Sequence, residues 1–144
     1  MTIWGIGAYL TSIPPEDVVR FFLNNGVAFI GHDLSKHPRL KELRKKIRLG
    51  DLIFIKSRHD YSKPLRIKGI GIVTDADWSL KYGYEDKEGI KVYWVKDLSG
   101  DDYVEIPAPN KYGSTHTLYQ ETDPTVIENI LNSLYKEKCK EKTL

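Results

Sequence analysis

The stretch that decides the fold is Gly50–Asp75, GDLIFIKSRHDYSKPLRIKGIGIVTD. It contains two apolar runs, Leu52–Lys56 and Leu65–Thr74, on either side of a polar loop. Short apolar runs that are bounded by turn residues are typical of buried β-strands. We therefore expect two adjacent core strands here, with the rest of the chain arranged around them.

The second run carries two glycines, Gly69 and Gly71. Successive side chains of a strand point to opposite faces, so both glycines should share a face with Ile67 and Val73. Two glycines leave a bare patch on that face, which either admits a ligand or lets another part of the chain pack closely. Close packing is the favoured interpretation.

The remaining pattern predicts further strands and helices. Strands are expected at Thr2–Ala8, Val27–Ile30, Ile90–Val95 and Tyr103–Ile106. Helices are expected from Ser12–Asp17 to Gly26, over Pro38–Ile47, and from Asp123 onward, since each begins with capping residues or proline. Asp75–Glu88 and Pro107–Gly113 are predicted to be loops, and Ser114–Glu121 is left unassigned.

Strands outnumber the helices that could cross between parallel strands, which argues against a doubly wound sheet. The predicted fold is α+β: a small, curved, mostly antiparallel sheet or barrel of five or six strands with flanking helices. The chain has 144 residues, which suits one domain. We expect this domain to cover residues 1–135 and residues 136–144 to be a charged tail or linker.

Composition excludes several classes of protein. The single cysteine, Cys139, can form neither an internal disulfide nor a cysteine-built metal site. The sequence shows no basic leader with an apolar core and no apolar stretch long enough to span a membrane. We therefore expect a soluble, cytoplasmic protein.

Enzyme signatures are weak. The four histidines lack metal-ligand spacing, and the two GxG motifs lack the third glycine and helix of a dinucleotide site. Ser57, His59 and Asp60 are neighbours in one loop, whereas catalytic triads are assembled from separate elements. We expect no catalysis and no cofactor.

Binding features are stronger. Residues 36–48 contain seven Lys or Arg against one acid, Glu42, and could contact phosphates, although a solvated helix face is the common alternative. Aromatic residues in the expected loops could stack on bases, or could fold back over the core. These aromatics are Tyr61, Trp78, Tyr82, Tyr84 and Tyr112, whereas Tyr93 and Trp94 lie in a strand that should bury one of them.

The order of motifs resembles the PUA-like superfamily, specifically the EVE domain and its YTH relatives. The motifs are IWGIGAY, PPEDV, VAFIGHD, GDLIFIKS, LRIKGIGIVTD and DWSLKYGYEDKEGIKVYWVKDL, followed by TLYQETD. They are also similar to the N-terminal recognition domains of McrB-type modification-dependent restriction systems.

The resemblance implies a small β-barrel with a pocket for a modified base in DNA or RNA. Trp78 matches a cage tryptophan, Tyr82 or Tyr84 a second wall, and His32 a position where relatives often have tryptophan. Ser57 and Asp33 could contact the base edge. The residues assigned to phosphate binding are Lys36, Arg39, Lys45, Lys56 and Arg58.

The expected function is therefore a non-catalytic reader of a flipped, modified base in DNA, serving as the specificity domain of a restriction system. The alternatives are an RNA reader, or a barrel that binds small molecules or proteins. A small hydrolase of nucleotides or nucleic acid is a further alternative, disfavoured by the lack of carboxylate or histidine clusters. The charged tail would suit a linker to a GTPase motor in a longer chain.

Overall fold

The computed structural model describes residues 1–10, 16–58, 63–82, 84, 87–100, 103–107 and 117–143. The described strands are β1 Ile3–Gly7, β2 Tyr9–Leu10, β3 Glu16–Asp17, β4 Val27–Phe29, β5 Leu52–Ser57, β6 Leu65–Lys81, β7 Glu88–Asp97, β8 Val104–Ile106 and β9 Leu118–Gln120. The described helices are α1 Val19–Asn25, the short 3-10 helix η1 Leu34–Lys36, α2 Pro38–Arg44 and α4 Pro124–Thr143.

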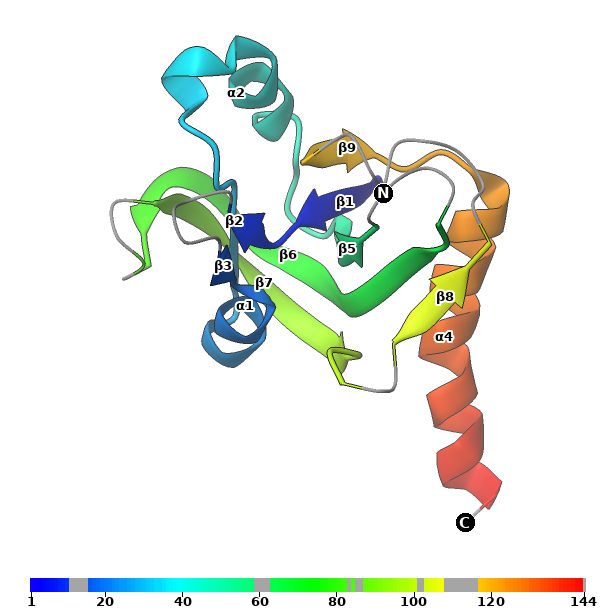
Figure 1. The fold of residues 1–144 in the computed structure, drawn as a ribbon. Coiled ribbons are helices and arrows are strands. Elements are labelled where there is room, and N and C mark those ends of the chain that lie inside the picture. Colours follow the sequence, from blue (N-terminus) through cyan, green and yellow to red (C-terminus); the bar gives the residue numbers. More distant parts are fainter. Residues whose placement is uncertain are drawn as a thin grey trace.

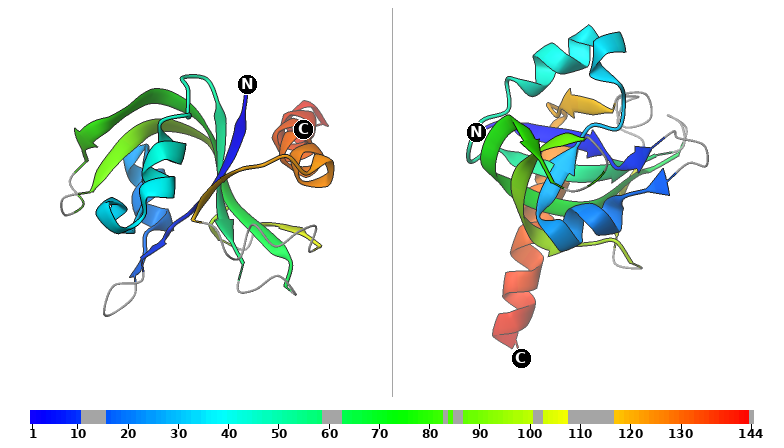
Figure 2. Two further views of the ribbon diagram at one scale, coloured as in Figure 1. Left: turned by 90° about the horizontal axis from the view of Figure 1, so that it is seen from above. Right: turned by 90° about the vertical axis from the view of Figure 1, so that its left-hand side faces the viewer.

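Seven of these strands form one sheet in the order β4-β7-β6-β5-β1-β9, with β8 pairing to β6 (Figure 1). The pairs are antiparallel except for β1 and β5, which run parallel. The sheet curls strongly, as the view from above in Figure 2 shows. The architecture is thus α+β with a curled, mostly antiparallel sheet, in agreement with the fold class expected from the sequence.

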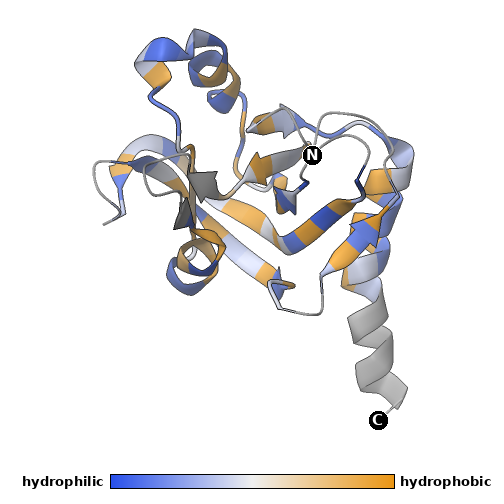
Figure 3. Ribbon diagram, viewed as in Figure 1, coloured by the Kyte–Doolittle hydropathy of each residue, from blue (hydrophilic) through white to orange (hydrophobic). Residues whose placement is uncertain are grey.

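The curled sheet separates two hydrophobic clusters. The first holds Trp4, Ile6 and Phe22, with α1 and α2 packed against it, and the second holds Phe54, Ile67 and residues of α4. Apolar and polar positions alternate along β6 in Figure 3, as expected of a strand whose two faces meet different surroundings.

The glycines of β6 are places of close packing. A Cβ atom on Gly71 would lie 2.5 Å from Val92 Cγ1, and one on Gly69 would lie 3.1 Å from Ile55 Cδ1. This confirms the favoured interpretation of the bare patch. The prediction that Ile67 shares their face is wrong, because the β5–β6 register shifts between Ile55 and Lys56 and places Ile67 in the second cluster.

Helix α1 begins later than the sequence indicated. Glu16 and Asp17 belong to β3, and Asp17 Oδ1 accepts a hydrogen bond of 2.9 Å from the Val19 N–H at the helix start. The predicted end is confirmed: Gly26 adopts a left-handed conformation with φ 65° and its N–H donates to Phe22 O.

One further prediction is wrong, and one stretch that was left unassigned contains a strand. Residues 75–81 continue β6 instead of forming a loop, and Leu80 and Lys81 pair with β7. The unassigned stretch before Glu121 contains β9, which pairs with β1. At the C-terminus the start of the predicted helix is confirmed, since Asp123 Oδ1 accepts a hydrogen bond from Thr125 N. The helix continues to Thr143, beyond the expected boundary at residue 135.

None of the described helices is both long and apolar enough to cross a membrane.

Candidate functional site

The two edge strands of the sheet, β4 and β9, are joined by a side-chain hydrogen bond. His32 follows β4 and Thr117 precedes β9, and His32 Nε2 lies 2.8 Å from Thr117 Oγ1. The two residues are 85 positions apart in sequence. We call this junction the seam, because it links the two ends of the curled sheet.

A cavity of about 740 Å³ opens beside the seam, between α2 and β9. We call it the seam cavity. Its lining consists of His32, His37, Pro38, Arg39, Leu40, Glu42, Leu43, Lys46, Thr117 and Leu118. The two imidazole rings lie 4.7 Å apart between centroids. The cavity therefore combines aliphatic walls, two flat rings and a hydroxyl, with charged residues on α2.

A second cavity of about 350 Å³ lies on the other side of His32, which contributes to both linings. We call it the Arg44 cavity. It is lined by Ile30, His32, Asp33, Leu34, Ser35, Lys41, Arg44, Lys81, Lys87 and Glu88. Four of these side chains are cationic and two are carboxylates, so this cavity favours an anionic ligand.

The environment of His32 favours its neutral form. Burial lowers the pKa of His32 below 6.5, and the nearby His37 and Lys87 lower it further. Lys87 Nζ in turn donates a hydrogen bond of 3.0 Å to Gly31 O. A neutral imidazole can donate through one ring nitrogen and accept through the other, which suits contact with the polar edge of a base.

The Asp33 carboxylate caps the short helix η1. Its Oδ1 accepts from Ser35 Oγ at 2.7 Å and from Ser35 N at 3.0 Å, which caps η1. The hydrogen bond from the Ser35 side chain, followed by the one from its N–H, lowers the pKa of Asp33. Asp33 borders the Arg44 cavity but not the seam cavity.

The three aromatic residues assigned to the base pocket are used in packing. Trp78 is only 7% exposed and its indole N–H donates to Arg44 O at 2.9 Å. Tyr84 stacks on Phe29 at 5.2 Å between ring centroids, and the Tyr82 hydroxyl is buried. None of the three lines either cavity.

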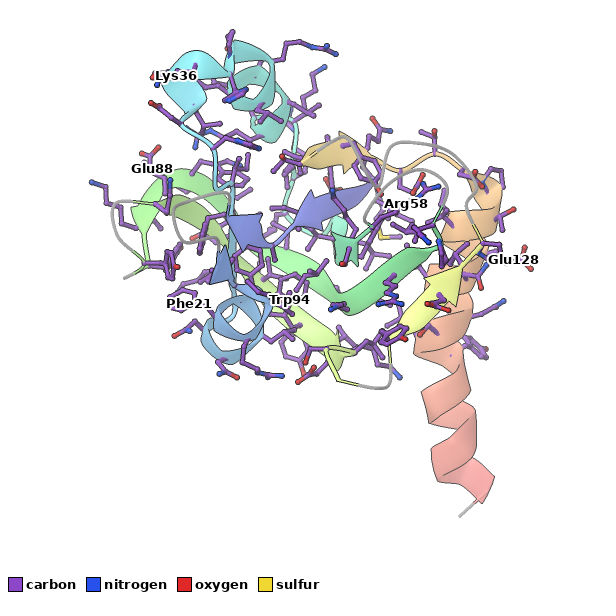
Figure 4. All side chains as sticks on the ribbon, viewed as in Figure 1. Phe21, Lys36, Arg58, Glu88, Trp94 and Glu128 are labelled. Carbon is purple, nitrogen blue, oxygen red and sulfur yellow. The ribbon has the colours of Figure 1, made fainter. Side chains whose placement is uncertain are left out.

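The residues assigned to phosphates fall into two separate groups. Lys36 lies in η1, Arg39 in α2 and Lys45 directly after α2. Lys56 and Arg58 lie at the end of β5, and Figure 4 shows Lys36 and Arg58 well apart. Of the first group, Arg39 lines the seam cavity, and Lys45 Nζ forms a 3.1 Å ion pair with Glu42.

The end of β5 forms a different, smaller pocket. A cavity of about 60 Å³ is lined by Ser57, Arg58, Lys63, Pro64 and Arg66. Arg58 Nε donates to Lys63 O at 2.8 Å. The base-pocket assignment required Ser57 to lie beside His32, but the two residues line different cavities. His59, Asp60, Tyr61 and Tyr112 lie outside the described residues.

Several residues that line the two cavities were missed by the sequence reasoning, among them Thr117 and Lys87. Thr117 gives no local signal, because its role depends on the approach of two strand edges. Arg44 belongs to the cationic run of residues 36–48, which was expected either to contact phosphates or to be a solvated helix face, yet it is buried. Within the described ranges, no group of three or more His, Cys, Asp or Glu side chains could hold a metal ion.

In comparisons with known proteins, no family model matches the sequence and no curated protein matches it.

Proposed function

We propose that this chain is a non-catalytic nucleic-acid-binding module that holds a single displaced base in the seam cavity. The observation that carries the proposal is that two cavities adjoin each other and share His32 in their linings. The seam cavity has aliphatic and imidazole walls, and the Arg44 cavity is lined by four cationic side chains. A nucleotide has the same two parts, a flat apolar base with a polar edge and an anionic phosphate.

The size and chemistry of the seam cavity suit a base. Small-molecule sites commonly measure roughly 300–1,000 Å³, with apolar walls and a few polar groups that fix orientation. Leu40, Leu43 and the ring of His37 would contact the faces of the base. His32 and Thr117, which bond to each other without a ligand, could exchange that bond for contacts to the base edge.

A modified base is favoured for a physical reason. Each methyl group buried against aliphatic side chains contributes about 0.8 kcal/mol. Leu40, Leu43 and Leu118 supply such a surface. The resemblance of the motifs to recognition domains of modification-dependent restriction systems points to DNA, and to the role of a specificity domain alongside a GTPase motor.

The free energies are of compatible size. Displacing a base from a duplex costs a few kcal/mol. Stacking against flat side chains returns about 1–3 kcal/mol per base, though imidazoles are smaller platforms than indoles. Phosphate contacts from Arg39, Lys46 and neighbouring cations must supply the rest, and they should weaken as salt concentration rises.

The test is a fluorescence-anisotropy titration of short DNA and RNA duplexes, each with methylated or unmodified bases, at several salt concentrations. We expect methylated DNA to bind more tightly than unmodified DNA, and binding of both to fall with salt. Replacing an aliphatic wall, Leu40→Asn, should remove the preference for methylated DNA while leaving salt-dependent binding.

The matched control is Leu49→Asn, since Leu49 is 71% exposed and lines neither cavity. It should keep the preference. If the Leu40→Asn variant still prefers methylated DNA, the base does not bind in the seam cavity. Tighter binding of RNA would make the chain an RNA reader, and failure to bind any oligonucleotide would leave a small-molecule or protein-interaction module.

A further inference from the structure

Arg44 lies at the end of α2 with its side chain in an unusual position for an arginine. The side chain is only 10% exposed, although arginine is rarely buried without full pairing. Arg44 is one of the residues that line the Arg44 cavity. A buried cation that lacks full compensation is costly, so its position requires an explanation.

The guanidinium has few hydrogen-bond acceptors. Nη2 lies 3.3 Å from Glu88 Oε1, which is long for a charge-assisted hydrogen bond. Nε is buried and has no acceptor among the residues that the structure describes. A guanidinium presents several N–H donors in a rigid fork that matches the oxygens of a carboxylate or phosphate. Part of that fork therefore has no acceptor among the described residues.

Trp78 holds this arginine in place from beneath. The centre of the guanidinium lies 5.3 Å from the centroid of the indole ring, which permits a cation–π interaction. The indole N–H also binds the Arg44 carbonyl at 2.9 Å, at the last residue of α2. Trp78 therefore contacts both the side chain and the backbone of Arg44, and so fixes the position of this cavity-lining residue.

The surrounding charges select the class of ligand. Besides Arg44, the cavity is lined by Lys41, Lys81 and Lys87, against the carboxylates of Asp33 and Glu88. Four cations against two carboxylates leave a local excess of two positive charges. An excess of two charges matches a phosphate group, which carries one to two negative charges near neutral pH.

We propose that the Arg44 cavity is a phosphate-binding site in which the Arg44 guanidinium is the principal donor. The site itself needs only a phosphate group. Its assignment to a phosphate of a nucleic acid rests on the proposed function, since His32 separates this cavity from the base cavity.

The experiment follows the Nε–H signal of Arg44 in ¹⁵N spectra of the full chain. The probes are inorganic phosphate, a single-stranded oligonucleotide with or without a 5′-phosphate, and the same oligonucleotide with neutral methylphosphonate linkages. We expect inorganic phosphate to shift the signal at high concentration and an anionic oligonucleotide to shift it at a lower one.

Affinity measurements on variants accompany the spectra. Arg44→Lys keeps the charge but loses the fork and should weaken binding about tenfold or more. Lys81→Ala removes an exposed lysine of the same cavity and should weaken binding severalfold without endangering the fold. The matched control is Lys91→Ala, an exposed lysine that lines neither cavity and should change affinity less than twofold.

Each outcome identifies the source of the phosphate or rejects the site. Dependence on the 5′-phosphate indicates a terminal phosphate, and loss of the shift with methylphosphonates indicates an internal one. A shift with inorganic phosphate alone supports the site and rejects the nucleic-acid function. Oligonucleotide binding that leaves the Arg44 signal unmoved, and that Arg44→Lys and Lys81→Ala do not weaken, rejects the site and leaves the nucleic-acid function standing.

Discussion

The side-chain amino group of Lys56, near the end of β5, is largely buried. Its side chain lies over Gly7, where an added Cβ atom would be 3.4 Å from Cε and 3.5 Å from Nζ. Burial lowers the pKa of Lys56 from 10.5 to about 8. No ion pair of its ammonium with a described carboxylate compensates this cost.

Replacing Lys56 with methionine should stabilise the fold at pH 7. A folded-state pKa of about 8 against 10.5 means that the unfolded chain binds more protons between these values, so wild-type stability should rise as pH increases through that window. We expect Lys56→Met to gain about 2 kcal/mol at pH 7, because one pKa unit corresponds to about 1.4 kcal/mol and part of the ammonium stays hydrated. Urea unfolding at pH 7, 8, 9 and 10 measures this.

In the variant the rise in stability above pH 8 should disappear. Lys91→Met on the exposed face of β7 is the control and should retain the wild-type profile. A Lys56→Met protein that remains as pH-dependent as the wild type would show that another group titrates in this range.

At the scale of elements, β6 is the strand on which the sheet depends. It pairs with β5, β7 and β8, and it changes register with β7 several times along its length. One of these shifts lies between Ile70 and Gly71. The shift brings the next strand so close that Gly71 has no room for a side chain.

Gly71→Ala should therefore be strongly destabilising. The new Cβ atom would lie 2.5 Å from Val92 Cγ1 and 2.8 Å from the Tyr93 carbonyl oxygen, and the carbonyl cannot move without breaking strand pairing. Overpacking of this kind costs about 1–3 kcal/mol, and we expect the upper end, measured as the change in the urea midpoint.

Gly100→Ala provides the comparison, since a Cβ atom added at Gly100 would meet nothing within 4 Å. Its stability should stay within about 0.5 kcal/mol of the wild type. Equal effects of the two substitutions would mean that β6 and β7 can separate more easily than their packing indicates.

At the scale of the whole molecule, the seam is a side-chain contact between the two ends of the open, curled sheet. Edge strands expose unpaired backbone groups, and closure removes that liability. Here β4 and β9 do not pair with each other along the sheet. The side chains of His32 and Thr117 connect the two edges instead.

Thr117→Val removes the hydroxyl while keeping the shape of the side chain. We expect a loss of about 1 kcal/mol in stability, the usual worth of such a bond, and faster native-state hydrogen exchange of the β9 amides over Leu118–Gln120. Thr122→Val, at an exposed position beyond β9, should change neither. Unchanged exchange in Thr117→Val would show that the strand pairing of β9 with β1 alone holds this edge.

Local signals in the sequence predicted local structure well. The cap at Asp123 and the left-handed Gly26 are confirmed because both depend on residues within one turn. Trp94 packs against the core while Tyr93 is 65% exposed, as strand alternation required. These features follow from the chain's own short-range geometry.

Long-range features were harder to predict. Residues 75–81 look like a polar loop, but pairing with β7 and burial of Trp78 draw them into β6. Of the predicted base-pocket residues, only His32 lines the seam cavity, and Arg39 is the predicted phosphate contact beside it. The role of Thr117 and the burial of Arg44 could not be predicted from the sequence, since both depend on segments that approach only in the folded sheet.

The place of β1 in the sheet sets the order in which the chain can complete its fold. This strand lies between β5 and β9, so its two neighbours are made at very different times during synthesis. One side of β1 can pair once Leu52–Ser57 has left the ribosome, but the other stays open until Leu118–Gln120 emerges. Between these two events the nascent chain carries an exposed edge of β1, which only the pairing with β9 covers.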